Sequence, residues 1–230
     1  MKPGPDPNFP YLDQTIRFNF PDPDEWDDNI ISVGGNLSPG LLLSAYEQGI
    51  FPWYNPEDPV IWQSPDPRCV IFPDNLHISS SMQKILNNGT FKITYDTNFE
   101  GVIRGCAEVN RPSQNGTWIT DDIIEAYIEL HRLGWAHSAE AWSGTGLEDE
   151  LTGGCYGVLM GRAFFGESMF AKKPNASKAA FLSFAQLLFD HRVAFIDCQL
   201  PTKHLLSLGG EEMARSDFLE LLHLYRVSRF

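Results

Sequence analysis

The sequence of 230 residues is poor in basic residues, with 17 Lys and Arg against 30 Asp and Glu and a formal net charge of −13. Such a chain repels polyanions on average, so any nucleic-acid partner has to bind a local basic patch. The sequence also lacks a run of the roughly 18 apolar residues needed to cross a membrane. Its polar, proline-rich first residues do not form the apolar centre of a secretion signal. These absences predict a soluble, cytoplasmic protein that does not bind a membrane.

Motifs for metals and for common cofactors are absent as well. The four cysteines, Cys69, Cys106, Cys155 and Cys198, include no C-x-x-C pair, which excludes a zinc ribbon and a dithiol redox motif and suits a reducing compartment. The six histidines form no H-E-x-x-H, and there is no G-x-S-x-G elbow or G-x-x-x-x-G-K-[ST] loop. We therefore expect neither a metal nor a cofactor.

Apolar residues, in contrast, are plentiful: 43% of the chain is hydrophobic, with 16 Phe, 7 Tyr and 6 Trp. This content excludes a fully disordered chain and is enough for a buried core. Prolines and acidic residues dominate residues 1–30, and aromatic, proline-rich loops lie near 60–67. We place a boundary there, between a small N-terminal domain at 1–64 and a larger domain at 65–230.

Strands and helices alternate in the larger domain, which predicts a mixed α+β fold. We expect short strands, rich in β-branched and aromatic residues, at 68–72, 91–95, 136–142, 154–160, 162–168 and 193–200. Helices are predicted from their capping residues and apolar spacing: one from Ser38-Pro39 to Gly49, one over 79–86, and others capped by Thr120, Asn175 and Ser216.

One predicted strand carries a carboxylate and an amide. Residues two apart in a strand face the same side, so Asp197 and Gln199 are expected to project together. A carboxylate among apolar residues needs a partner or a chemical task. Asp197 is either a structural acid bonded to a loop, or it helps Gln199 to polarise or deprotonate a nucleophile.

A second acid, Glu167, lies in a strand that is otherwise made of Phe and Met. Together with the apolar wall around it, this acid suggests a pocket that takes a cation at one end and an apolar group at the other. The alternative is an ion pair with Lys172 or Lys173.

Several aromatic residues are predicted in loops, namely Trp53, Tyr54, Trp62 and Trp118. They are either packing residues or, together, a surface on which a flat base can stack. The segment 175–178 opens a helix after two lysines, and this suits either a phosphate or an ordinary helix cap.

Ordered motifs between residues about 30 and 220 closely resemble the bacterial leucyl/phenylalanyl-tRNA–protein transferase family. They include V-G-G-N-L-S-P (33–39), G-I-F-P-W-Y (49–54), S-P-D-P-R (64–68), T-W-I-T (117–120), G-E-S-M-F (166–170), I-D-C-Q (196–199) and S-L-G (207–209). The resemblance implies a larger domain like the GNAT acyltransferases, with a mixed sheet flanked by helices. It also implies transfer of Leu or Phe, sometimes Met, from aminoacyl-tRNA to the N-terminal Arg or Lys of a protein, which creates a degradation signal.

The resemblance further implies roles for individual residues. Gln199 would accept a hydrogen bond from the attacking amine, Asp197 would raise its basicity, and Glu167 would be an active-site acid. The terminal adenosine and aminoacyl group would be held by Trp53, Tyr46 and Trp118. The pocket for the aminoacyl side chain would be lined by Cys155, Phe164, Met169, Phe181, Phe184 and Ile196.

Local charge suggests where tRNA phosphates bind. The segment 171–205 is positive by three, and we expect a weak phosphate-binding face formed by Arg68, Lys84, Lys172, Lys173 and Lys178. The chain departs from the family pattern at Gln63, where a second Trp is usual, at Ser80, where an Arg is common, and in a longer, acidic segment at 143–152.

Two other functions remain open at this point. One is an acetyltransferase that uses acetyl-CoA, although no [RQ]-x-x-G-x-[GA] turn is present. The other is a non-catalytic module that binds N-terminal basic residues through Glu167 and Asp197 and leaves the aromatic residues without a task. We expect the protein to be a monomer.

Overall fold

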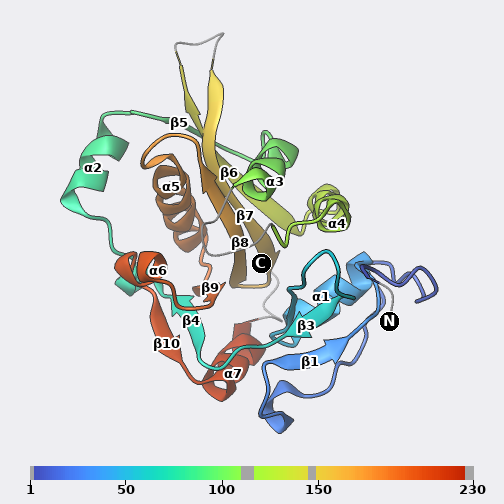
Figure 1. The fold of residues 1–230 in the computed structure, drawn as a ribbon. Coiled ribbons are helices and arrows are strands. Elements are labelled where there is room, and N and C mark those ends of the chain that lie inside the picture. The colour runs from blue at the N-terminus through green and yellow to red at the C-terminus, as the bar shows by residue number, and fades with distance from the viewer. Residues whose placement is uncertain (1–2, 110–116, 145–148, 226–230) are drawn as a thin grey trace.

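Two β-sheets organise the chain in the computed structural model, which describes residues 3–109, 117–144 and 149–225 (Figure 1). The smaller sheet is antiparallel, in the order β1 (Ile30–Val33), β3 (Ile61–Gln63), β2 (Phe51–Pro52). It lies beside α1 (Pro39–Glu47), where Pro39 occupies the first turn and so does not interrupt the hydrogen bonds of the helix. These elements form the N-terminal part of the molecule.

The larger sheet has seven strands in the order β10-β4-β9-β8-β7-β6-β5. Their bounds are β4 (Arg68–Ile71), β5 (Lys92–Tyr95), β6 (Ala136–Ser143), β7 (Glu150–Met160), β8 (Ala163–Ala171), β9 (Phe195–Gln199) and β10 (Glu211–Met213). Neighbouring strands are antiparallel except for β8 and β9, which are parallel and are joined through α5 (Ala176–Asp190). The sheet is therefore mixed.

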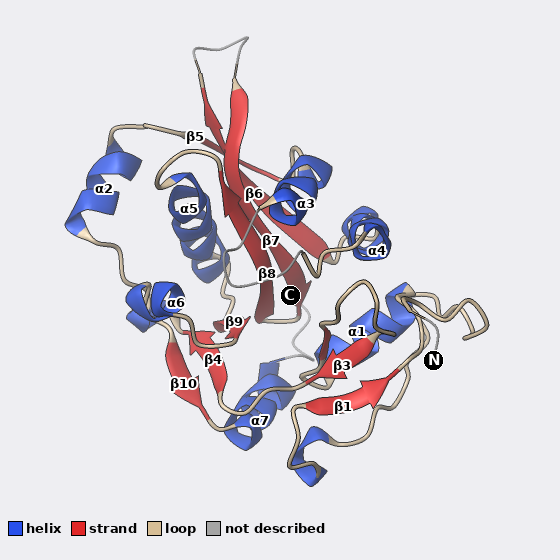
Figure 2. Cartoon of the chain, viewed as in Figure 1, coloured by secondary structure: helices blue, strands red, loops and turns tan. Residues whose placement is uncertain are grey.

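Helices cover both faces of the larger sheet (Figures 1 and 2). On one face α5 packs over the central strands, while α3 (Phe99–Glu108) and α4 (Asp121–Arg132) cover the other face. The remaining helices are α2 (Ser80–Asn87), α6 (Lys203–Ser207), α7 (Arg215–Tyr225) and the short 3-10 helices η1 (Pro23–Glu25) and η2 (Pro73–Asn75). Each face of the sheet has its own apolar core, and α1 shares the core of α3 and α4.

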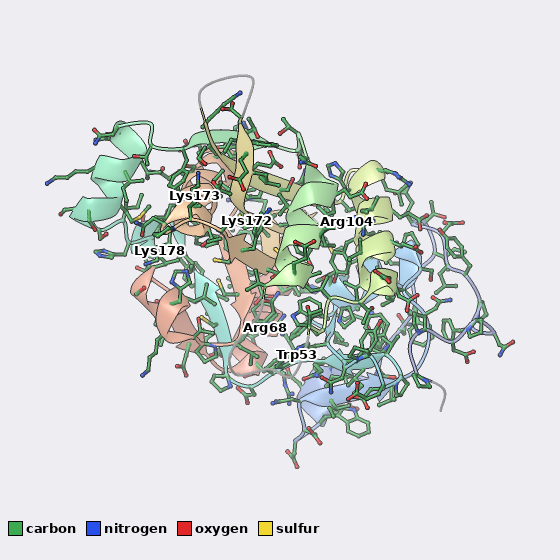
Figure 3. All side chains as sticks on the ribbon, turned by 45° about the horizontal axis from the view of Figure 1, so that its top comes forward. Trp53, Arg68, Arg104, Lys172, Lys173 and Lys178 are labelled. Carbon is green, nitrogen blue, oxygen red and sulfur yellow. The ribbon has the colours of Figure 1, made fainter. Side chains whose placement is uncertain are left out.

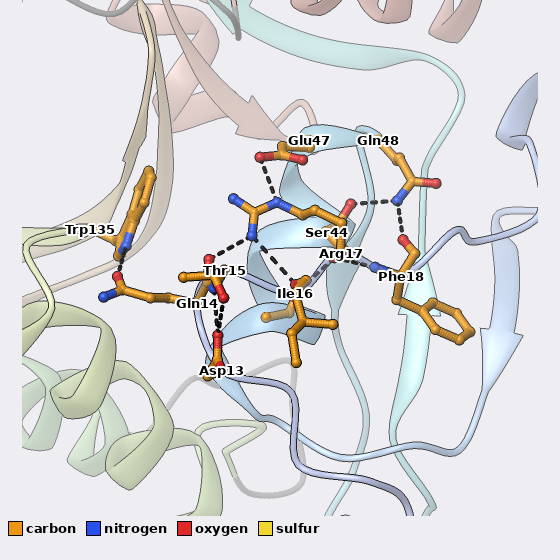
Figure 4. A network of polar contacts seen from close by, with 11 residues as sticks. Asp13, Gln14, Thr15, Ile16, Arg17, Phe18, Ser44, Glu47, Gln48 and Trp135 are labelled. Carbon is orange, nitrogen blue, oxygen red and sulfur yellow. Dashed lines mark hydrogen bonds and ion pairs between the residues drawn. The ribbon is translucent and has the colours of Figure 1, made fainter.

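A network of polar contacts attaches the first residues to α1 and to the larger sheet (Figure 4). Arg17 forms an ion pair with Glu47, and the backbone N–H of Phe18 donates to the Ser44 hydroxyl at 2.8 Å. The Trp135 indole, which precedes β6, donates to the Gln14 side chain at 2.8 Å. An irregular segment can thus hold a defined course because its backbone and side chains find partners on regular elements.

The predicted mixed fold with a small N-terminal part is confirmed, and the six predicted strands of the larger domain are all present. Ser216, which was predicted to cap the last helix, lies inside that helix, because α7 begins at Arg215. Asn175 does precede α5, but its side chain makes no capping hydrogen bond and its φ is 69°. Sequence patterns missed α3, α6 and the short strands β1, β2, β3 and β10. The strands β2, β3 and β10 have only two or three residues, which carry too little periodicity to indicate a strand.

Candidate active site

The two carboxylates meet where the parallel strands β8 and β9 stop pairing. The pairing runs from Ala163 with Phe195 to Phe165 with Asp197, and beyond it β8 continues along β7 while β9 stays paired with β4. The next residue of β8, Gly166, still lies close to β9, since a Cβ built there would be 3.5 Å from the Asp197 carbonyl oxygen. The two strands are therefore still adjacent where they begin to diverge.

Asp197 is fully buried and forms a two-pronged ion pair with Arg68 of β4. Arg68 Nε donates to Asp197 Oδ1 at 2.8 Å and Arg68 Nη2 donates to Oδ2 at 2.6 Å, and both side chains are completely inaccessible. The prediction that Arg68 binds tRNA phosphate is therefore wrong. An arginine in a strand whose four residues are all buried needs an internal counter-charge, and Asp197 supplies it.

Gln199 is positioned through its backbone. Its N–H donates to Asp197 Oδ1 at 2.9 Å, and its φ of 57° lies in the left-handed region, which is unusual for a residue other than glycine. This turn ends the simple alternation on which we based a common direction for the two side chains. The Asp197 carboxylate contacts the backbone N–H and not the side-chain amide, whose Nε2 is buried and has no hydrogen-bond partner among the described residues.

Glu167 accepts hydrogen bonds from two tyrosines of the N-terminal part and of α4. Tyr46 donates to Oε1 at 2.7 Å and Tyr127 donates to Oε2 at 3.3 Å, and the two phenols also contact each other. Burial raises the pKa of Glu167 from 4.5 to about 7, assisted by the charge of Asp197 and opposed by both phenols and Arg68. Burial also raises the pKa of each phenol well above its usual value, so both phenols remain hydrogen-bond donors at neutral pH.

The alternative of an ion pair between Glu167 and a nearby lysine is not what the structure shows. Lys173 donates to the Ser143 hydroxyl at 2.6 Å and lies 3.9 Å from Glu150. Part of the acidic segment at 143–152 thus contacts Lys173, while residues 145–148 of that segment, including Glu148, lie outside the described residues.

A β-bulge in β8 gives Glu167 its direction. Two consecutive residues of β7, Tyr156 and Gly157, pair with residues on either side of Glu167, which itself has no partner residue. An inserted residue of this kind reverses the alternation of side chains beyond it. Phe164 before the bulge and Met169 after it consequently pack on the same side, against α5, although an odd number of positions separates them.

The six residues predicted to line an apolar pocket do come together. Five are buried in the core beneath α5 and the sixth, Met169, packs against it; they are Cys155, Phe164, Phe181, Phe184, Ile196 and Met169. The rings of Phe164 and Phe184 meet edge to face, with centroids 5.1 Å apart. This cluster belongs to the core on one face of the larger sheet, whereas Tyr46 and Tyr127 belong to the core on the other face.

The predicted aromatic residues divide into two sets. Trp53 and Trp118 are half-buried at the edge of the core, and they remain candidates for base stacking. Trp62 lies in β3, so the prediction that it is a loop residue is wrong, whereas Tyr54 does lie in a loop. Trp62 is 1% exposed and Tyr54 is 3% exposed, which fits the alternative that both are packing residues. Tyr46 is fully buried and reaches the site through its hydroxyl alone.

Four of the five predicted phosphate-binding residues are at the surface. Lys84, Lys172 and Lys173 are exposed and Lys178 is half-buried. Lys172, Lys173 and Lys178 lie together near the start of α5, apart from Arg68 and Trp53 (Figure 3). The basic surface is thus separate from the buried guanidinium.

Sequence reasoning missed two participants, Tyr127 and the internal role of Arg68. Tyr127 lies on the buried face of α4, where helical spacing indicates only a packing role. The sequence did contain an indication that Arg68 is an internal partner. A carboxylate predicted to be buried, such as Asp197, needs a partner, and Arg68 begins the apolar strand predicted at 68–72.

The described part of the chain contains neither a metal-binding cluster nor a membrane-spanning helix. No group of three or more His, Cys, Asp or Glu in these residues could hold a metal ion. No helix among them is long and apolar enough to cross a membrane. All four cysteines lie in the described part of the chain, are buried and form no disulfide.

Comparison with known proteins gives the family. Among solved structures, L-PGS from Bacillus licheniformis is similar with a TM-score of 0.42 and 13% identity, over 69% of this chain and 52% of that chain, which is too distant to support an argument. The model of the leucyl/phenylalanyl-tRNA protein transferase family matches residues 70–223, and that of its N-terminal domain matches residues 35–66.

Two curated relatives extend this match over most of the chain. The leucyl/phenylalanyl-tRNA–protein transferase of Anaeromyxobacter dehalogenans (strain 2CP-C) is 51% identical over 204 residues, which are 88% of this chain and 86% of that protein. The transferase of Hahella chejuensis is 47% identical over 219 residues, which are 95% and 92% of the two chains. The chain therefore belongs to the leucyl/phenylalanyl-tRNA–protein transferase family and is an aminoacyltransferase.

Proposed function

We propose that this chain transfers Leu or Phe, and sometimes Met, from aminoacyl-tRNA to the α-amine of an N-terminal Arg or Lys and so marks the acceptor protein for degradation. The proposal includes a cytoplasmic monomer, a division into domains at 1–64 and 65–230, and a GNAT-like larger domain. Its main support is the divergence of β8 and β9, two strands that carry Glu167 and Gln199 and that also contribute Phe164, Met169 and Ile196 to one apolar cluster.

The transfer reaction requires the enzyme mainly to position the two substrates. The α-amine attacks the carbonyl carbon of the aminoacyl ester, a C–N bond forms, and the C–O bond to the ribose breaks while the amine proton passes to the leaving oxygen. Because the ester is already activated, the enzyme has to orient the amine, accept its hydrogen bond and stabilise the oxyanion.

The amide of Gln199 can serve this reaction in two ways. Its oxygen can accept a hydrogen bond from the attacking amine, which raises the electron density on nitrogen. Its Nε2 is buried and has no hydrogen-bond partner among the described residues, so this donor can serve an oxyanion. Asp197 has both oxygens occupied by Arg68 and by a backbone N–H, so its role is to position Gln199.

Glu167 supports selection of a basic acceptor. A carboxylate held by two phenols has a defined direction and can pair with the side chain of Arg or Lys. The apolar cluster supports a donor that is Leu, Phe or Met, since an apolar pocket discriminates by only about 1–3 kcal/mol per methylene. Trp53 and Trp118 would stack on the terminal adenosine.

The test is a transfer assay with purified protein. Leu-tRNA or Phe-tRNA should label a peptide that begins with Arg or Lys, and should not label the same peptide after N-acetylation. A peptide that begins with Ala is the control for acceptor selection. Absence of transfer with every charged tRNA tried would refute the proposal, and labelling by acetyl-CoA alone would instead identify an acetyltransferase.

A further inference from the structure

Arg68 is completely buried, as are Glu140 and Asp197, and nothing in the reaction itself requires its charge. Its guanidinium lies between two aromatic rings, with its carbon 5.1 Å from the centroid of Phe51 and 4.3 Å from that of Phe218. Nη1 donates to the carbonyl oxygen of Gly49 at 3.0 Å. These three contacts come from β2, α7 and the end of α1, so elements distant in the sequence hold the guanidinium.

The Gly49 carbonyl is itself held rigidly. The Ser64 hydroxyl donates to it at 3.0 Å, and the Gly49 N–H donates to the Tyr46 carbonyl oxygen at 3.1 Å. Gly49 has a φ of +73°, and a Cβ there would lie 2.4 Å from Leu219 Cδ2, so a side chain does not fit. Arg68 is therefore anchored on the N-terminal part of the chain, independently of the strand that carries Asp197.

From this anchor the contacts continue to Gln199. Arg68 binds both carboxylate oxygens of Asp197, and Asp197 Oδ1 accepts the backbone N–H of Gln199. That N–H belongs to the residue with a φ of 57°, where the cost of the left-handed conformation has to be offset by its surroundings.

We propose that Arg68 is a positioning residue for aminoacyl transfer: it transmits the position of the Gly49 turn through Asp197 to the backbone of Gln199 and so aims the side-chain amide at the reacting amine. This inference rests on the proposed function, since it assigns Gln199 to the transfer step. Arg68 touches neither substrate, and its effect is on the rate of reaction after binding.

A matched control is available in Arg215. This residue is 6% exposed, and its guanidinium donates to the carbonyl oxygens of Trp26, Asp28 and Ser64, which also belong to the N-terminal part. It has no described contact with Asp197 or Gln199. Loss of either arginine should destabilise the fold, but only Arg68 should affect Gln199.

The experiment compares Arg68→Lys with Arg215→Lys, because lysine keeps the positive charge but cannot bind both Asp197 oxygens and Gly49 together. A misplaced reacting group costs about 100-fold in rate, so we expect kcat of Arg68→Lys to fall by about that factor. The KM for aminoacyl-tRNA should stay within about twofold, as should both constants of Arg215→Lys. Equal losses of kcat in the two variants at equal melting temperature would overturn the proposal.

Two further measurements separate positioning from folding and from the proposed function. In Arg68→Ala, added methylguanidinium should restore part of kcat, whereas it should not restore activity in Asp197→Asn. The NMR signal of the Gln199 backbone amide should shift in Arg68→Lys and not in Arg215→Lys, and an unmoved signal would overturn the proposal. The NMR result does not depend on activity, so an inactive wild-type protein would refute the function while the positioning contacts remain testable.

Discussion

At the scale of single residues, Glu167 is the group whose chemistry depends most on its surroundings. Burial favours the protonated acid, while the hydroxyls of Tyr46 and Tyr127 favour the carboxylate. Because burial is the larger effect, the pKa rises to about 7 and the carboxyl group changes charge near neutral pH. Its affinity for a cationic acceptor should therefore depend on pH in the range where the enzyme works.

We expect the KM for an acceptor peptide with N-terminal Arg to rise as the pH falls below about 7. The change should approach about tenfold per pH unit, because only the ionised form of Glu167 pairs with the acceptor. The α-amine of the acceptor also titrates and contributes to the pH dependence of KM. The control is Glu167→Gln, in which the contribution of Glu167 to this pH dependence should be lost. Parallel pH profiles of KM in the two proteins would contradict this assignment.

The raised pKa of Glu167 should also make the free energy of unfolding depend on pH. Its pKa is about 7 in the folded protein and about 4.5 in the unfolded chain, so the folded state binds the proton more tightly. This contribution to the free energy of unfolding is complete below pH 4.5 and is lost as the pH rises to about 7. Urea titrations should show a smaller loss in Glu167→Gln over that interval.

At the scale of elements, close contact between α5 and β7 determines how the apolar cluster is assembled. Gly153 of β7 lies directly beneath the first turn of α5, and a Cβ there would be 2.6 Å from the Cβ of Ala176. Two small residues in register let the helix approach the sheet. The side chains of Phe181 and Phe184, one and two turns further along α5, then reach the cluster.

Gly153→Ala should therefore lower the free energy of unfolding by about 1–3 kcal/mol, because the added methyl group overpacks a contact with no free space. Urea denaturation measures this change. The control is Gly166→Ala in the adjacent strand, where the nearest atom would be at an ordinary distance of 3.5 Å. Equal stability losses in both variants would show that the contact between α5 and β7 is not the cause.

At the scale of the whole molecule, charge is distributed unevenly around a net value of −13. Acidic residues are frequent in the N-terminal segment from Asp22 to Asp28, whereas Lys172, Lys173 and Lys178 lie together near the start of α5 (Figure 3). With Arg68 buried, the candidate phosphate-binding face has four lysines, namely Lys84, Lys172, Lys173 and Lys178. The tRNA should therefore be bound mainly at its acceptor end, through few phosphate contacts.

Binding of aminoacyl-tRNA should depend weakly on salt, with a slope of log K against log salt of magnitude below about 4, since each phosphate contact contributes about 0.7–0.9. Fluorescence titrations over a range of salt concentrations measure this slope. Lys172→Gln and Lys178→Gln should each reduce it by about 1. Lys92→Gln, which removes an exposed lysine paired with Asp149, should leave it unchanged. A much steeper slope would mean that other basic residues contact the tRNA.

Much of the local structure could be predicted from the sequence because its causes are local. Pro39 marked the start of α1, and the side chain of Thr120 caps α4 as expected. The ordered motifs between residues about 30 and 220 were sufficient to identify the family. The apolar strands of the larger sheet were found because each has enough residues to show its composition.

Tertiary structure alone decided how the candidate site is built. The bulge in β8 that directs Glu167 also reverses which side chains of this strand face each side of the sheet. The residue types in the sequence do not indicate where such a bulge occurs. The partners of Glu167 come from α1 and α4, and Arg68 meets Asp197 across 129 positions of sequence. Whether an ionisable side chain binds a substrate or an internal partner depends on its burial, and burial results from the packing of elements that are distant in the chain.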